Sequence, residues 1–244
     1  MSDAATHRRY CRRSGLSELV EHDSVSLVLL RWFIDEDLRV ERIPSDALPD
    51  ELRSLLGRAS AAAAAPVYLI DVTTDLDVPA YTAVAPAVDH GPTLVGAGAS
   101  VSSRYAAQRA LDELIQCSTV AKRASSTGRP VRLARWYALQ QCAVLPVPYL
   151  LSGMVRDVPL RDTSDDGADL ERSLHDLSER LSNRGVAYFV CDLTPRASLI
   201  DVAATIAPGL ERFSLVRLDV PVIPTGRGWP IWRGRVPTTA PRAD

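Results

Sequence analysis

Apolar residues in the first part of the chain recur at the spacing of an amphipathic helix. Between residues 14 and 34 they fall mostly three or four positions apart, which places them on one face of a 3.6-residue period. Similar spacing predicts helices over residues 46–58, 102–121 and 170–183, and Gly185 stands where the last of these would end. We therefore expect several amphipathic helices that each bury one face.

Between these helices lie short runs of β-branched and aromatic residues, which favour strands. Such runs occupy residues 67–73, 79–84, 93–98, 186–194 and 215–221. The first and the fourth are both apolar runs that end in Asp-x-Thr, which suggests two related strand units. Because strands and helices are interleaved, the pattern predicts an α/β or α+β domain, and we assign α+β with helices packed on mixed sheets.

Three other segments have weaker patterns. Residues 125–148 are ambiguous, and residues 154–169 are charged and short of apolar residues, which favours a mobile loop. The last segment, 224–244, is rich in Pro, Gly and Arg and predicts a loop or tail. The expected organisation is therefore one domain over residues 1–223 followed by this tail.

Composition narrows the class of protein. The chain has 244 residues, 46% of them hydrophobic, and a net charge of -2, which suits a globular protein with a sizeable core. A near-neutral charge argues against nucleic-acid binding, because neutralising phosphates takes a concentrated basic face. No apolar run reaches the roughly 18 residues of a membrane span, and the start lacks the apolar core of a signal peptide. The cysteines are scattered, so we expect a cytoplasmic protein with reduced thiols.

Two acidic signatures inside predicted helices carry the candidate chemistry. Glu18 and Glu21 lie three positions apart near the start, and Glu113 and Gln116 have the same spacing near the middle. Positions three apart share one helix face, so each pair offers two oxygen-bearing side chains to one neighbour. Two such faces could hold a metal-bound polyphosphate. The alternative for the Glu-x-x-Glu pair is an ordinary solvated helix face.

These signatures and the residues around them resemble those of YcaO domains. Residues 16–23, LSELVEHD, are similar to the family's LxELIERD helix, and residues 96–116 are similar to its GxGA...A...ALxEliQ segment. The order of the motifs agrees with the family from Gly15 to about Pro221. The segments that resemble the family's intervening and final strands are residues 71–79, 192–194 and 216–221.

The resemblance implies an ATP-dependent enzyme that modifies ribosomally made peptides in natural product biosynthesis. Such an enzyme phosphorylates a backbone amide oxygen, and attack by a Cys, Ser or Thr side chain or by an external nucleophile then gives an azoline, a thioamide or a related product. Mg²⁺ held by carboxylates neutralises the charge of ATP as the phosphoryl group moves. The absence of a Gly-rich Walker loop from the chain agrees with this type of site.

The same resemblance implies roles for individual residues. Glu18 and Glu21 are candidate Mg²⁺ ligands, and Glu113 and Gln116 are candidate metal or nucleotide contacts. Arg217 is a candidate phosphate contact, since its fork of donors suits phosphate oxygens. A salt bridge at a strand edge is the alternative for Arg217. No catalytic residue is assigned.

The chain also departs from the family's pattern. It begins after the N-terminal portion that carries the family's first nucleotide motif, and His22 stands where the family usually has Arg. Histidine is neutral for much of the time near pH 7, so it would clamp phosphate less firmly. An isolated half-domain would leave a sheet edge and apolar surface uncovered, so we expect a partner. That partner is a separately encoded N-terminal half, a second copy of the chain, or a protein that presents the leader of the precursor peptide.

Three functional hypotheses stay open. The first is a YcaO-like subunit that works with a partner in azoline or thioamide formation on a precursor peptide. The second is a catalytically degenerate relative that binds peptide or scaffolds an active partner, and the third is a silent fragment left by truncation. A Ser-His-Asp hydrolase is disfavoured, because no serine lies in a G-x-S-x-G elbow.

Overall fold

The computed structural model describes residues 3–88, 93–123, 132–133, 135–163, 169–195 and 200–235. A five-stranded sheet in the order β4-β3-β2-β1-β5 forms its centre. β1 and β5 run parallel, and the other neighbours are antiparallel. The strands are β1 (Arg39–Ile43), β2 (Tyr68–Asp71), β3 (Ala80–Ala85), β4 (Leu94–Ala99) and β5 (Met154–Asp157).

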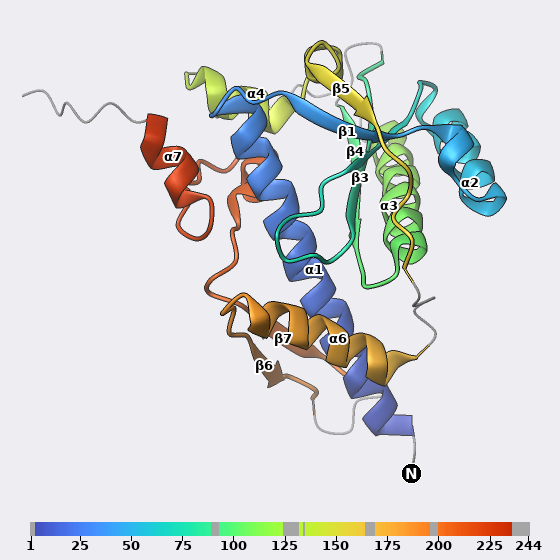
Figure 1. The fold of residues 1–244 in the computed structure, drawn as a ribbon, viewed down its shortest axis with the longest axis vertical. Helices are drawn as coiled ribbons and strands as arrows, with labels where there is room; N and C mark the ends of the chain where they lie inside the picture. The colour runs from blue at the N-terminus through green and yellow to red at the C-terminus, as the bar shows by residue number, and fades with distance from the viewer. Residues whose placement is uncertain are drawn as a thin grey trace, which may run out of the picture.

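Helices cover both faces of this sheet (Figure 1). α1 (Asp3–Phe33) packs on one face, in an apolar cluster that contains Ile70 of β2. α2 (Asp50–Ala63) and α3 (Ser103–Arg123) cover the other face, in a second cluster that contains Tyr81 of β3. Because successive strand residues point to opposite faces, one sheet supplies both clusters.

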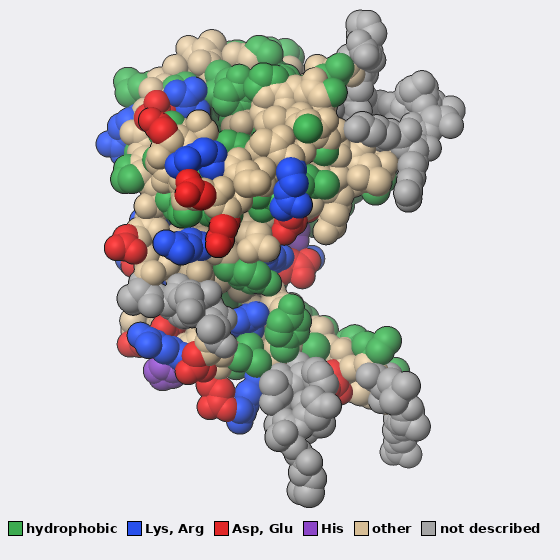
Figure 2. Space-filling view, turned by 90° about the vertical axis from the view of Figure 1, so that its right-hand side faces the viewer, with side chains coloured by type: hydrophobic (Ala, Val, Ile, Leu, Met, Phe, Trp, Pro, Cys, Tyr) green, Lys and Arg blue, Asp and Glu red, His purple; other side chains and the backbone are tan. Residues whose placement is uncertain are grey.

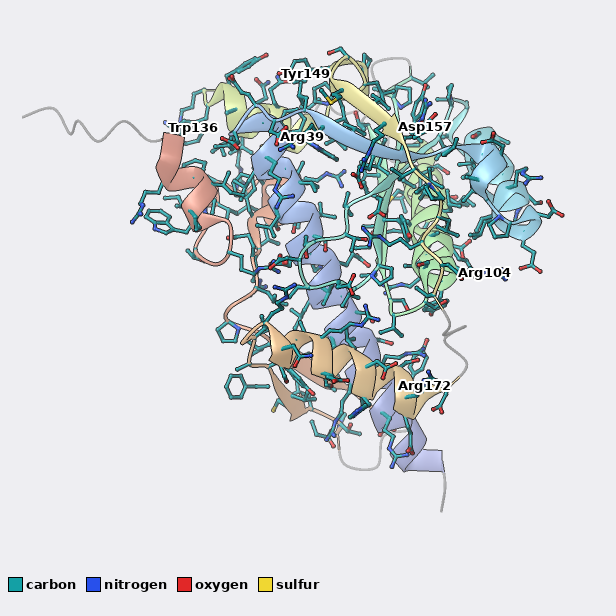
Figure 3. The ribbon with its side chains drawn as sticks, viewed as in Figure 1. Arg39, Arg104, Trp136, Tyr149, Asp157 and Arg172 are labelled. Carbon is teal, nitrogen blue, oxygen red and sulfur yellow. The ribbon has the colours of Figure 1, made fainter. Side chains whose placement is uncertain are left out.

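A smaller unit packs on the N-terminal half of α1, at the lower end of Figure 1. Asp169 caps its helix, because the Asp169 Oδ1 accepts hydrogen bonds from the amides of Glu171 and Arg172. Arg172 marks this unit in Figure 3, well away from Asp157 on β5. The elements of the unit are the helix α6 (Leu170–Asn183) and an antiparallel hairpin of β6 (Phe189–Asp192) and β7 (Ala203–Ile206).

A buried ionic network ties the C-terminal part of the chain to α1. Arg227 Nη1 donates to Asp23 Oδ2 at 2.6 Å, and Asp23 Oδ1 accepts from the Glu211 amide at 2.8 Å. The Asp23 side chain is fully buried, so these donors compensate the cost of its burial. The remaining elements are η1 (Ser45–Ala47), α4 (Tyr137–Val144), α5 (Val147–Leu150), η2 (Phe213–Leu218) and α7 (Trp229–Arg235).

The larger elements agree with the sequence-based predictions. The predicted helices correspond to α1, α2, α3 and α6, and α6 has the predicted bounds. The predicted strands over residues 67–73, 79–84, 93–98 and 186–194 correspond to β2, β3, β4 and β6. The α+β class is therefore confirmed. In the described part of the chain, none of the helices combines the length and apolar character needed to cross a membrane.

The predicted strand over residues 215–221 is wrong. Residues 213–218 form the 3-10 helix η2, in which Phe213 and Val216 are buried three positions apart. That spacing matches the three residues per turn of a 3-10 helix. Packing of η2 against α1 and α4 therefore overrides the strand propensity of this apolar run.

Two segments predicted to be irregular contain regular elements. Residues 154–157, within the predicted loop, form β5, which pairs with β1; the sequence prediction missed both strands. Residues 229–235, within the predicted tail, form α7, and residues 236–244 lie outside the described residues. Charged residues such as Glu41 in β1 and Arg156 in the edge strand β5 interrupt the apolar pattern, although the pairing of the two strands satisfies their backbone groups.

Candidate functional site

A cleft lies between α1 and α3, beside the edge strand β4. Its volume is about 540 Å³. Figure 2 shows the molecule hollowed between its larger upper part and its smaller lower part, with acidic, basic and histidine side chains at the edge of the hollow. The cleft brings together the two acidic pairs that are far apart in the sequence. The residues that line it are Glu18, Glu21, His22, Ala97, Tyr105, Gln108, Arg109, Asp112, Glu113 and Gln116.

A close approach of β4 to α3 positions Glu113. A Cβ on Gly96 would lie 2.2 Å from the Ala110 carbonyl oxygen, so only glycine permits this approach, and Gly98 is equally crowded. Glu113 then reaches the free edge of β4, where its Oε2 accepts from the Ala97 amide at 2.7 Å. An edge-strand amide has no ladder partner on that side, so a backbone donor holds this carboxylate in place.

Glu21 faces the same cleft from α1 and is buried. Burial raises the pKa of its carboxyl from its ordinary value of 4.5 to about 7, opposed mainly by Arg109. Arg109 Nη2 lies 3.3 Å from Glu21 Oε2, while the charges of Glu113 and Glu18 raise the pKa further. Glu21 Oε2 makes no hydrogen bond. Near neutral pH, a partly charged carboxyl oxygen with spare acceptor capacity therefore faces the cleft.

Glu18, His22 and Gln116 lie nearer the open side. Glu18 Oε1 is 3.6 Å from His22 Nε2, and the Glu18 side chain is 64% exposed, so this pair is weak. The other ring nitrogen of His22, Nδ1, lies 3.3 Å from the Ser214 hydroxyl. The His22 ring therefore contacts Glu18 of α1 and Ser214 of η2. The predicted pairs are thus assembled in one place, with His22 beside them.

Arg217 lies beside this cleft, in a second cavity of about 250 Å³ that shares Glu21, His22 and Glu113 with it. The Nε of Arg217 is buried and has no hydrogen-bond partner. Burial lowers the pKa of its guanidinium, while Cys117 and Glu113 act in the opposite direction. Arg217 is therefore a partly buried cation that shares a cavity with Glu21 and Glu113, and it lies on a 3-10 helix instead of the predicted strand.

Other cleft residues were missed by the sequence analysis. Arg109 precedes Glu113 by four positions and shares its helix face, so this spacing was an available signal. Tyr105 is also in the cleft wall, and its ring lies 5.8 Å from the Arg13 guanidinium of α1. No local sequence pattern links those two residues, because only the folded chain brings α1 and α3 together.

The residues present fit Mg²⁺ that is bound together with phosphate. In the part of the chain that the structure describes, no group of three or more His, Cys, Asp or Glu could hold a metal by itself. Mg²⁺ in nucleotide sites, however, takes one or two carboxylates and completes its shell with phosphate oxygens and waters. The unbonded Glu21 Oε2 and the neighbouring Glu113 supply carboxylates of this kind. Arg109 and Arg217 add positive charge for phosphate oxygens.

A family comparison decides the class of this chain. The family model described as YcaO cyclodehydratase, ATP- and Mg²⁺-binding, matches residues 7–211. The chain belongs to the YcaO family. The resemblance seen in the sequence is thereby confirmed, and the family's description agrees with the predicted cofactors, ATP and Mg²⁺.

Longer proteins share this sequence or fold. The chain is 30% identical over 210 residues to an uncharacterised protein in the tfuA 3′ region of Rhizobium leguminosarum bv. trifolii, covering 81% of this chain and 48% of the relative. YcaO from Methanopyrus kandleri, bound with AMPPCP and Mg²⁺, matches with a TM-score of 0.64 at 23% identity, over 87% of this chain and 56% of that chain. A heterocyclase in complex with substrate and cofactor matches with a TM-score of 0.60 at 19% identity, over 80% and 26%. This chain spans about half the length of the curated relative that it matches.

Proposed function

We propose that this YcaO chain contributes the carboxylate side of a shared Mg²⁺–ATP site for modification of ribosomally made precursor peptides. The reaction class is azoline or thioamide formation in the cytoplasm, and a protein partner completes the site. Glu18 and Glu21 are the proposed Mg²⁺ ligands, Glu113 and Gln116 are the proposed metal or nucleotide contacts, and Arg217 is the proposed phosphate contact. The observation that carries the proposal is the convergence of both acidic helix faces on one cleft.

The side chains of the cleft have different tasks in this proposal. Mg²⁺ supplies neutralisation of phosphate charge, which makes the γ-phosphoryl group transferable. Carboxylates from α1 and α3 would hold the metal ion, while Arg109 and Arg217 would donate to phosphate oxygens. Because Glu21 is buried, its interactions act in a medium less polar than water and are stronger there.

A thermal-shift titration tests the nucleotide site. ATP and Mg²⁺ together are expected to raise the Tm of the chain, since a ligand that binds the native state stabilises it by mass action. At a hundredfold excess over Kd the gain is about 2.7 kcal/mol, or about 5–10 °C for a chain of this size. ATP alone and Mg²⁺ alone are expected to give much smaller shifts.

The outcomes separate a shared site from an absent one. A shift that appears only after the partner polypeptide is added supports a site completed by that partner. A shift given by ATP alone and not increased by Mg²⁺ contradicts the metal role of the glutamates. No shift with or without the partner contradicts the proposed function.

The buried Glu21 predicts a pH dependence of Mg²⁺–ATP binding. Its raised pKa means that the folded chain keeps a proton which the unfolded chain has released. The stability due to this group is therefore fully present below pH 4.5 and is lost as the pH rises through about 7. A metal ion takes the deprotonated carboxylate, so binding releases a proton and tightens from about pH 6 to about pH 8.

Calorimetry in two buffers of different ionisation enthalpy measures that proton. Release of up to one proton near pH 6.5 is expected for the wild-type chain, and Glu21→Gln is expected to release less. The exposed Glu179 on α6 provides the matched control, Glu179→Gln. Proton release that is equal in the wild type and in Glu21→Gln would exclude Glu21 as a ligand.

A second function, a non-catalytic subunit, is favoured by His22. It replaces the arginine usual at this position of the YcaO motif, and its ring is engaged by Glu18 and Ser214. The double variant Glu18→Gln, Glu21→Gln in the assembled complex distinguishes the two functions by turnover of precursor peptide. Loss of turnover with intact assembly supports the metal role. Unchanged turnover with intact assembly supports a scaffold.

A further inference from the structure

The β6–β7 hairpin repeats the local structure of the β2–β3 hairpin. Asp71 Oδ1 accepts from the Thr73 amide at 2.8 Å, and Asp192 Oδ1 accepts from the Thr194 amide at 2.9 Å. Each threonine hydroxyl then accepts from an amide at the start of the return strand, Ala80 at 3.1 Å and Val202, just before β7, at 3.0 Å. A 14-residue helix precedes each hairpin, so the repeated unit is helix, strand, strand.

The strand register extends this equivalence to the two faces of each hairpin. Tyr68 pairs with Val84 in the first hairpin, as Phe189 pairs with Ile206 in the second. The face of the first hairpin that carries Ile70 and Val84 is buried in the apolar cluster formed with α1. The equivalent face of the second hairpin, which we call the outer face, consists of Phe189, Cys191, Leu193, Val202, Ala204 and Ile206.

The outer face is apolar and lies open in this structure. Phe189 is 63% exposed, and Ile206, directly opposite it, is 55% exposed. Leu193 and Val202, at the other end of the hairpin, are also exposed, and no charged side chain belongs to the outer face. Figure 2 shows hydrophobic side chains on the smaller, lower part of the molecule. Contiguous apolar surface of this kind marks an interaction site.

The opposite face of the hairpin is already occupied. A Cβ on Gly15 of α1 would lie 2.3 Å from Thr205 Oγ1, so α1 and β7 are in close contact there. Tyr188, just before β6, bonds through its hydroxyl to Ser178 of α6 at 2.8 Å. The elements α1 and α6 thus cover the inner face, as α2 and α3 cover the corresponding face of the first hairpin.

We propose that the outer face of β6–β7 binds an apolar helix from the part of a YcaO polypeptide that lies outside the region matched by this chain. The repeat indicates that the occupant is a helix, because the helix α1 covers the equivalent face of β2–β3. The relatives supply the polypeptide, because this chain covers only 48% of the Rhizobium relative and 56% of the Methanopyrus protein. A helix with apolar residues at positions i, i+3, i+4 and i+7 matches a face without charges.

This inference rests on the proposed function, because it names the protein partner that the function requires. Its test needs no nucleotide. Cys191 lies in the middle of the outer face and is an exposed, free thiol, so its reaction rate with a water-soluble disulfide reagent reports coverage. The probe is the half of the Rhizobium leguminosarum relative that this chain does not match, fused to a soluble carrier protein. A Cys191→Ser chain supplies the background rate of the other cysteines.

Saturating probe is expected to slow the Cys191 reaction at least about tenfold. The double variant Phe189→Ser, Ile206→Ser is expected to weaken binding of the probe by about tenfold or more, because it removes two large apolar contacts. Val120→Ser, an equally apolar and 66% exposed position on α3, is the matched control and should bind as the wild type does.

The further outcomes either overturn this inference or separate it from the proposed function. An unchanged Cys191 rate with a probe that is folded by circular dichroism overturns it. Protection of Cys191 that grows with the concentration of this chain alone assigns the outer face to a second copy. If the probe folds only in the presence of this chain, the two polypeptides are expressed together and purified through a tag on one of them. Failure of the probe to purify with this chain then overturns the inference. Loss of the ATP shift with intact protection of Cys191 contradicts the proposed function and leaves this inference standing.

Discussion

Glu113→Gln is expected to abolish the stabilisation that ATP and Mg²⁺ together give to the chain. The amide oxygen of the new glutamine side chain can still accept the hydrogen bond from the Ala97 amide, so the substitution removes the charge and keeps the fold. Without that charge, Mg²⁺ loses one of its carboxylates. The expected loss is the full gain of about 2.7 kcal/mol at a hundredfold excess of ligand, or about 5–10 °C in Tm.

Thermal denaturation with and without Mg²⁺–ATP checks this expectation. The Tm of Glu113→Gln without ligand should stay close to that of the wild type. Glu179→Gln, which removes an exposed charge on α6 far from the cleft, should keep the whole ligand-dependent shift. A wild-type shift in Glu113→Gln would remove Glu113 from the site.

Gly96→Ala is expected to give a large loss of stability for so small a substitution. The new Cβ would meet the Ala110 carbonyl oxygen at 2.2 Å and the Leu114 amide nitrogen at 2.4 Å. Both atoms are backbone, so α3 must move away from β4. Overpacking of this kind costs about 1–3 kcal/mol, and we expect the upper end because neither partner is a flexible side chain. Displacement of α3 also moves Glu113 away from Ala97, so ligand-dependent stabilisation should fall as well.

Urea denaturation measures this loss, with Gly57→Ala as the control. Gly57 lies within α2 and has no atom within 4 Å of the position of an added Cβ. Alanine there should stabilise the chain by up to about 1 kcal/mol, because glycine is a poor helix former. If both variants lose similar stability, the contact between β4 and α3 is not the cause.

Periodicity predicted those elements whose apolar residues face one side. The α6 pattern is clear because a long amphipathic helix bounded by Asp169 and Gly185 carries its own start and stop signals. β1 and β5 were missed, because charged residues such as Glu41 and Arg156 interrupt their apolar pattern and the two strands are held by pairing with each other. The run around Arg217 was misassigned, since its contacts with α1 come from a distant part of the chain.

For the site, the two acidic signatures predicted the candidate residues. Because the signatures are far apart in the sequence, it could not predict how their side chains are arranged in the cleft. Glu21 and Glu113 converge because glycines in β4 let α3 approach while α1 crosses the other face of the sheet. The raised pKa of Glu21 follows from that burial and has no counterpart in a local motif. Arg109 was within reach of sequence reasoning, because it stands one helical turn before Glu113.

Glu113 also occupies a backbone donor on an edge strand of the sheet. β4 is an edge strand, and its Ala97 amide is already bound by the Glu113 carboxylate. An edge with an occupied donor and an adjacent negative charge is a poor template for a strand from another molecule. A homologue that no longer binds nucleotide would therefore still be expected to retain this glutamate. Retention of Glu113 among relatives is consequently weak evidence of activity. Its replacement would indicate that another segment or another polypeptide covers the free edge of β4.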